Sequence, residues 1–118
     1  MVRQGYRGEY IAKRKLIETY GVENVIKTAC NRGIPDYIIL KPLMGVEIKS
    51  SKRNKIYIKP REVKQWRATH QWMKIKRAPI DYWLITHNEK GRNIEIIPHA
   101  EFGSKYIEPY IRKHGEPK

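Results

Sequence analysis

Two apolar segments separated by a short turn are the feature that most constrains the fold of this chain. Residues 36–40 and 46–51 are rich in Val and Ile, and Pro42 and Gly45 lie between them. β-Branched residues are typical of strands, whereas Pro and Gly are typical of turns. The two segments therefore predict a β-hairpin.

Helix-like and strand-like segments surround this hairpin. Apolar residues recur at helical spacing over 9–20, and Pro60 begins a second helical segment that runs to about Lys76. Further strands are expected at 25–29, 80–87 and 93–97. The order α-β-β-β-α-β-β predicts an α/β protein with a mixed central sheet flanked by helices.

The length and composition of the chain indicate one domain without a membrane segment. Its 118 residues predict a single domain over 1–118, with 108–118 partly disordered because that end carries little pattern. No apolar run reaches the roughly 18–20 residues that cross a bilayer, and no export signal begins the chain. Cys30 is the only cysteine, which excludes an intramolecular disulfide. We therefore expect a cytoplasmic protein, in the host cytoplasm if the chain is viral.

The net charge points to a polyanionic partner. The chain has 25 Lys and Arg against 12 Asp and Glu, a formal net charge of +13. Residues 1–64 hold 15 of the basic residues but only 6 of the acidic ones. Basic residues that serve solubility or heat resistance would be expected to come with more acids. The charge therefore favours nucleic acid binding, and an anionic membrane surface is a weaker alternative.

Asp36, Glu47 and Lys49 are the residues of the predicted hairpin that can carry chemistry. The hairpin places Asp36 beside Glu47, and the two-residue period of a strand puts Lys49 on the same side. Two converging carboxylates suit Mg²⁺ or Mn²⁺, and the backbone carbonyl of Ile48 could add a ligand. Such a metal activates water for phosphodiester hydrolysis, while Lys49 orients the water or offsets negative charge. The alternative is a solvated surface pair of Glu47 and Lys49.

Glu9 is a third acidic candidate. It lies on the apolar stripe of the first helical segment, where a charge is costly unless it is paired or bound to a metal. The alternative is a position in the first helical turn, where the helix dipole favours acids. We predict that Glu9 completes a catalytic set with Asp36, Glu47 and Lys49.

Several segments resemble archaeal-type Holliday junction resolvases, which belong to the PD-(D/E)XK nuclease superfamily. The similar segments are Arg7-Gly8-Glu9, 34–41, 46–50 and 55–58, in the same order and spacing. The resemblance implies a restriction-endonuclease-like fold and a homodimer that resolves four-way DNA junctions by paired symmetric incisions. It also implies that Glu9, Asp36 and Glu47 hold Mg²⁺ directly or through water and that Lys49 is the catalytic lysine.

Basic residues near the hairpin are candidates for contact with the DNA backbone. Residues 27–33 depart from the Arg-Ser-containing loop of the family, and Arg32 is the candidate phosphate contact there. The full candidate set is Arg7, Arg32, Lys52, Arg53, Lys55, Tyr57, Lys59 and Arg61. Such a set would hold phosphates without reading bases, although each residue alone is equally expected on a solvated surface.

The sequence is also compatible with other functions. The Gly-Ile-Pro-Asp run is also similar to other PD-(D/E)XK branches, including the virus-type replication-repair nuclease domain. One alternative is therefore a nuclease for other branched, nicked or linear DNA, and another is a non-catalytic DNA-binding module. Trp72 and Trp83 are candidates for the core, for base stacking or for an exposed dimer interface.

Overall fold

A computed structural model describes residues 4–29 and 32–117, with side chains from residue 8 onward. The helices are α1 (Gln4–Tyr20), η1 (Val22–Asn24), α2 (Pro60–Lys76), α3 (His99–Phe102), the π-helical turn η2 (Gly103–Ile107) and α4 (Glu108–His114). The strands are β1 (Val25–Lys27), β2 (Tyr37–Leu40), β3 (Leu43–Ser50), β4 (Ile80–Asn88) and β5 (Gly91–Pro98).

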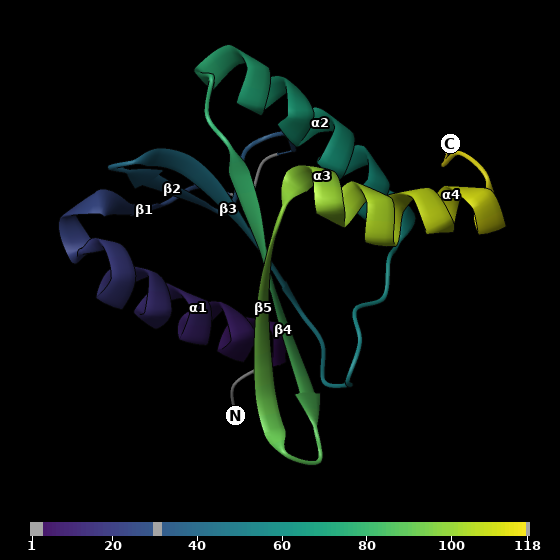
Figure 1. Cartoon of the computed structure of the whole chain (residues 1–118), viewed down its shortest axis with the longest axis horizontal. Coiled ribbons are helices and arrows are strands. Elements are labelled where there is room, and N and C mark those ends of the chain that lie inside the picture. The colour runs from purple at the N-terminus through teal and green to yellow at the C-terminus, as the bar shows by residue number, and fades with distance from the viewer. Residues whose placement is uncertain (1–3, 30–31, 118) are drawn as a thin grey trace.

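The five strands form one mixed sheet in the order β1-β2-β3-β4-β5. All neighbours are antiparallel except β3 and β4, which are parallel and are joined through α2. A parallel pair needs such a crossover connection, whereas a tight turn suffices for the hairpins. Helix α1 lies on one face of the sheet, and α2 and the C-terminal helices lie on the other (Figure 1). The predicted hairpin and the predicted mixed sheet flanked by helices are confirmed.

Each face of the sheet carries its own hydrophobic core. Ala12 and Leu16 of α1 pack with Tyr37, Ile39 and other residues of the first face. The second core includes Val63 of α2, Tyr82 and Leu84 of β4, and Phe102 and Ile107 near the C-terminus. Alternate side chains of a strand point to opposite faces, so the central strands supply both cores.

Strand β3 shows how this alternation separates core from polar residues. Val46 is buried in the α1-side core, and Ile48 packs against it. Glu47 and Lys49 are paired in register with Tyr82 and Leu84, whose side chains belong to the other core. The predicted alternation along β3 is therefore confirmed: Val46 and Ile48 face α1, whereas Glu47 and Lys49 face α2.

The C-terminal segment is helical over Glu108–His114, within the range 108–118 that we predicted to be partly disordered. Helix α4 covers Glu108–His114 and continues directly from α3 and η2. Ile107 is buried, and Tyr106, Tyr110 and Ile111 pack against the α2-side core. This helix is difficult to predict from the sequence, because Gly103 and Pro109 are residues that often mark turns and helix ends.

The two tryptophans considered for an exposed interface lie in or against the cores. Trp83 is only 3% exposed and belongs to the α1-side core, so its use in an exposed interface was a wrong expectation. Trp72 is half-buried and packs against the α2-side core. Within residues 4–29 and 32–117, no helix has the length and apolar character that crossing a membrane requires.

Candidate functional site

A polar hollow of about 490 Å³ lies where the β2–β3 hairpin meets α2. Its lining comes from the loop before β2, from β3 and from the first turns of α2. The lining residues are Arg32, Ile34, Asp36, Glu47, Ile48, Lys49, Arg61, Glu62 and Gln65. The structure thus brings together Asp36, Glu47, Ile48 and Lys49, as the sequence predicted.

Asp36 and Glu47 are locked to each other through the backbone. The Asp36 N–H donates to Glu47 Oε1 at 3.0 Å, and the Ile48 N–H donates to Asp36 Oδ2 at 2.8 Å. These bonds use Oε1 of Glu47 and Oδ2 of Asp36, and a carboxylate has about four acceptor positions, so both groups retain lone pairs for a ligand. The two acids are therefore held in fixed positions at the base of the hollow.

The surroundings of the pair favour its protonated forms in the absence of a cation. Burial raises the pKa of Glu47 from 4.5 to about 7, and the charge of Asp36 adds to the rise. Burial also raises the pKa of Asp36, although the Ile48 N–H and the charge of Lys49 oppose the rise. Two buried carboxylates that repel each other are stabilised by a shared cation. Their hard oxygen atoms fit Mg²⁺ or Mn²⁺, with the Ile48 carbonyl as a further donor.

The chain just before β2 is fixed by Thr28 and by a glycine of β3. The Thr28 hydroxyl donates to the backbone carbonyls of Pro35 and Asp36, and the Thr28 N–H also donates to the Asp36 carbonyl. A Cβ atom on Gly45 would lie 2.5 Å from Pro35 Cγ, so only glycine allows this approach. These contacts orient Asp36 at the start of β2.

Gln65 is a site residue that sequence reasoning missed. Its Oε1 accepts from the Gly33 N–H at 2.9 Å, and its Nε2 donates to the Ile34 carbonyl at 3.3 Å. A side-chain hydrogen bond from Gln65 also opposes the rise in the pKa of Glu47. The available signal was the four-residue spacing from Arg61, which puts both residues on one face of α2.

Glu9 does not share the hollow of Asp36 and Glu47. It lines a neighbouring hollow with Lys27 and Tyr37, forms an ion pair with Lys27, and accepts a hydrogen bond from the Tyr37 hydroxyl at 3.3 Å. Among the described residues, no group of three or more His, Cys, Asp or Glu is placed to share a metal. Helix α1 covers the face of the sheet opposite α2, which explains the separation. Glu9 still influences Asp36, since its charge raises the pKa of Asp36.

The predicted DNA-contacting residues fall into three groups. Arg32 and Arg61 line the carboxylate hollow. Lys55 and Tyr57 line a different hollow, beside the C-terminal helices. Lys52, Arg53 and Lys59 are exposed and line neither hollow, and the side chain of Arg7 lies outside the described residues.

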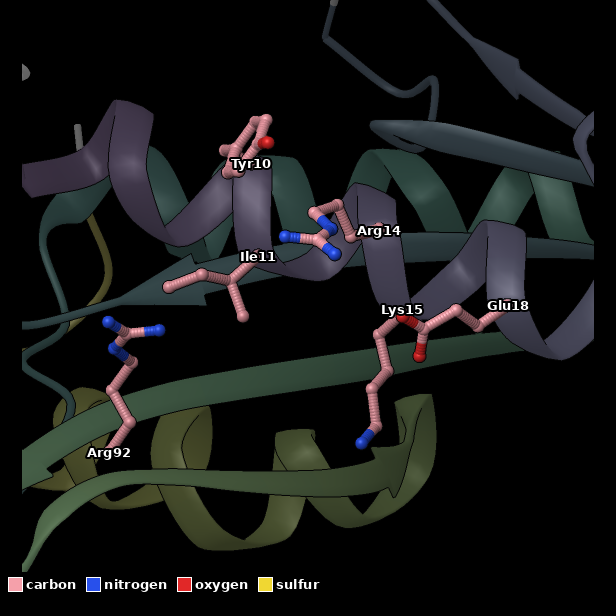
Figure 2. Close-up of a pocket in the computed structure, with 6 residues that line it drawn as sticks. All are labelled: Tyr10, Ile11, Arg14, Lys15, Glu18 and Arg92. Carbon is pink, nitrogen blue, oxygen red and sulfur yellow. The ribbon is translucent and has the colours of Figure 1, made fainter.

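A further hollow, between α1 and β5, is basic and lacks a carboxylate pair. Figure 2 shows Tyr10, Ile11, Arg14, Lys15 and Glu18 on the helix and Arg92 on the strand. The guanidinium of Arg14 lies 6.0 Å from the centre of the Tyr10 ring. With a single acid in its lining, this hollow does not fit a divalent cation.

Comparison with known proteins does not identify a family for this chain. No protein-family model matches the chain, and no curated protein shows significant similarity to it. A function for this chain therefore rests on the arrangement of Asp36, Glu47 and Lys49 and on the basic residues around them.

Proposed function

We propose that this chain is a metal-dependent endonuclease of the PD-(D/E)XK type. The observation that carries the proposal is the pair Asp36 and Glu47, locked by reciprocal backbone hydrogen bonds with Lys49 two residues further along β3. A solvated surface pair is a poor description of these residues, because Glu47 is only 2% exposed. Buried acids with raised pKa values in a hollow are typical of functional sites.

The residues of the hollow have distinct roles in this proposal. Asp36, Glu47 and the Ile48 carbonyl would hold Mg²⁺, or Mn²⁺ in its place, and Glu9 would act on the site through water or through Lys27. The bound metal supplies an activated water and a polarised phosphate. Lys49 offsets the negative charge that develops on the phosphate during cleavage. Gln65 and Thr28 position the loop and the carboxylates without touching the substrate.

The proposed substrate is double-stranded DNA with a branch, and foremost a four-way junction. Arg32 and Arg61 at the rim of the hollow and the net charge of +13 support binding to phosphates. Paired symmetric incisions in a junction with two-fold symmetry call for two sites, so we propose a homodimer with one site in each subunit. The second candidate is a nuclease for flapped, nicked or linear DNA, which the same site and charge support equally.

Cleavage of a panel of labelled DNA substrates tests this proposal. The panel contains a four-way junction, a flap and a linear duplex, each with Mg²⁺ and with EDTA, and light scattering gives the mass in solution. We expect metal-dependent paired cuts in the junction, little cutting of the duplex, and a mass of twice 14.1 kDa. Preferred cutting of the flap by a monomer would leave the second candidate. If none of the substrates were cut with Mg²⁺, the nuclease proposal would fail.

A further inference from the structure

The C-terminal helices and residues 55–58 line another hollow, which the proposed cleavage reaction does not use. Its volume is about 400 Å³, which is within the range of roughly 300–1,000 Å³ for small-ligand sites. It is a groove with three tyrosines, Tyr57, Tyr106 and Tyr110, and with Lys55, Lys105 and Lys113. The described residues that line it include no Asp or Glu. We call it the tyrosine groove.

Tyr57 is held outward by the alternation of its segment. Ile56 is buried and Ile58 packs against the α2-side core, so Tyr57 between them points away from it and is 49% exposed. The ammonium of Lys55 lies 5.3 Å from the centre of the Tyr57 ring, and the guanidinium of Arg53 lies 6.0 Å from it. An exposed aromatic ring with two cations nearby is a suitable surface for a base flanked by phosphates.

The opposite wall of the groove is rigid. Tyr106 packs on Phe102 with ring centres 5.0 Å apart, and Phe102 is buried in the α2-side core. Tyr106 follows Gly103 in the π-helical turn, and a Cβ atom on Gly103 would lie 2.3 Å from Trp66 Cζ2. π-Helical turns inside helices often occur at functional sites. This turn fixes Tyr106 and Lys105 beside residues 55–58.

We propose that the tyrosine groove binds unpaired nucleotides of a single-stranded DNA segment. Stacking on aromatic side chains needs exposed base faces, which a duplex does not offer, whereas lysines attract both forms. Residues 55–58 lead directly into α2, whose first turns line the carboxylate hollow. A strand displaced near the cutting site would therefore reach the groove. This inference rests on the proposed nuclease function and adds that a strand of the bound substrate is displaced and unpaired beside the cut.

Binding of single-stranded DNA by a Tyr57 variant tests the proposal. Fluorescence anisotropy in EDTA is measured with a labelled oligothymidine and with a duplex of equal length. We expect Tyr57→Ala to weaken single-strand binding roughly tenfold and duplex binding by less than about twofold, because only the single strand stacks. Tyr57→Phe keeps the ring and should restore single-strand binding. Tyr10→Ala, which removes a similarly exposed tyrosine on α1, is the matched control and should bind as the wild type does.

Photo-crosslinking provides a second readout that does not depend on the folding of a variant. An oligonucleotide with 5-iododeoxyuridine, irradiated on the wild-type protein, should attach to peptides that contain Tyr57, Tyr106 or Tyr110. Crosslinks confined to other segments would overturn the proposal, as would equal losses of single-strand and duplex binding in Tyr57→Ala. Preference for an acidic peptide over oligothymidine of equal charge would assign the groove to a protein partner instead.

These experiments can contradict the groove proposal and the nuclease proposal separately. If the wild type cuts DNA with Mg²⁺ while Tyr57→Ala binds single strands normally, the groove assignment is wrong and the nuclease proposal stands. If Tyr57→Ala loses single-strand binding while no DNA is cut, the groove stands as a nucleic acid site and the nuclease proposal is wrong.

Discussion

Asp36 and Glu9 are neighbouring acids in very different surroundings. Asp36 lies in the hollow on the α2 side, where it is bonded to the Ile48 N–H and faces the buried Glu47. Glu9 lies on α1, with about a third of its side chain exposed, and pairs with the cation of Lys27. One acid is paired with another acid in a buried site, whereas the other already has a positive partner near solvent.

This difference separates a metal-binding role from a supporting one. A buried pair of carboxylates carries repulsion that a divalent cation relieves, and the raised pKa values of Asp36 and Glu47 reflect that repulsion and their burial. Glu9 has its charge offset by Lys27 and has little to gain from a metal. The sequence predicted one catalytic set that contains Glu9, Asp36 and Glu47. Their surroundings favour metal binding by Asp36 and Glu47 and a supporting role for Glu9.

Loss of the Asp36 carboxylate should have the largest effect on cleavage. We expect Asp36→Asn or Lys49→Ala to reduce the cleavage rate by about 10²–10³-fold or more, because each removes a fixed charge at the reacting phosphate. Single-turnover cleavage of the best substrate measures this, and circular dichroism checks the fold. Glu18→Gln, an exposed acid on α1, is the matched control and should cut at the wild-type rate. Wild-type rates for both site variants would show that the site is assigned wrongly.

Replacement of Glu47 should change how stability depends on pH. Because the pKa of Glu47 rises from 4.5 to about 7 on folding, its favourable contribution is complete below pH 4.5 and is lost as the pH rises through 7. Without metal, Glu47→Gln should therefore match the wild type at pH 4.5 and exceed its free energy of unfolding by about 1–3 kcal/mol at pH 8. Urea denaturation in EDTA across this range measures the difference. Parallel curves for the two proteins would contradict the buried-pair description.

Replacement of Glu9 should have the smallest effect of the three. Glu9→Gln removes the partly exposed ion pair with Lys27, an interaction that typically contributes less than about 1 kcal/mol. We therefore expect cleavage to fall by no more than about tenfold. The same single-turnover assay measures this loss. A loss as large as that of Asp36→Asn would place Glu9 among the direct metal ligands and remove the contrast between the two acids.

Local patterns predicted much of the fold and the central part of the site. The hairpin, the helix that begins at Pro60, and the alternation that sends Val46 to the core and Glu47 to the site all follow from spacing along one segment. These features depend on neighbours in the sequence, so a single chain suffices to predict them.

The features that the sequence did not predict depend on packing between distant segments. Gln65 reaches the loop at Gly33 only because α2 lies across the hairpin, and no rule for isolated residues selects a glutamine. Glu9 is separated from Glu47 because α1 covers the other face of the sheet. The C-terminal helix is stabilised mainly by its contacts with the α2-side core, which lie far from it in the sequence.

Binding of Mn²⁺ to the wild type, Glu9→Gln and Asp36→Asn tests the central claim most directly. Electron paramagnetic resonance measures free Mn²⁺ during titration without DNA or catalysis. If Asp36 and Glu47 hold the metal, Glu9→Gln should bind Mn²⁺ nearly as the wild type does, and Asp36→Asn should lose most of the affinity. Loss of Mn²⁺ binding in Glu9→Gln with full binding in Asp36→Asn would contradict the account and move the metal to the hollow beside Lys27.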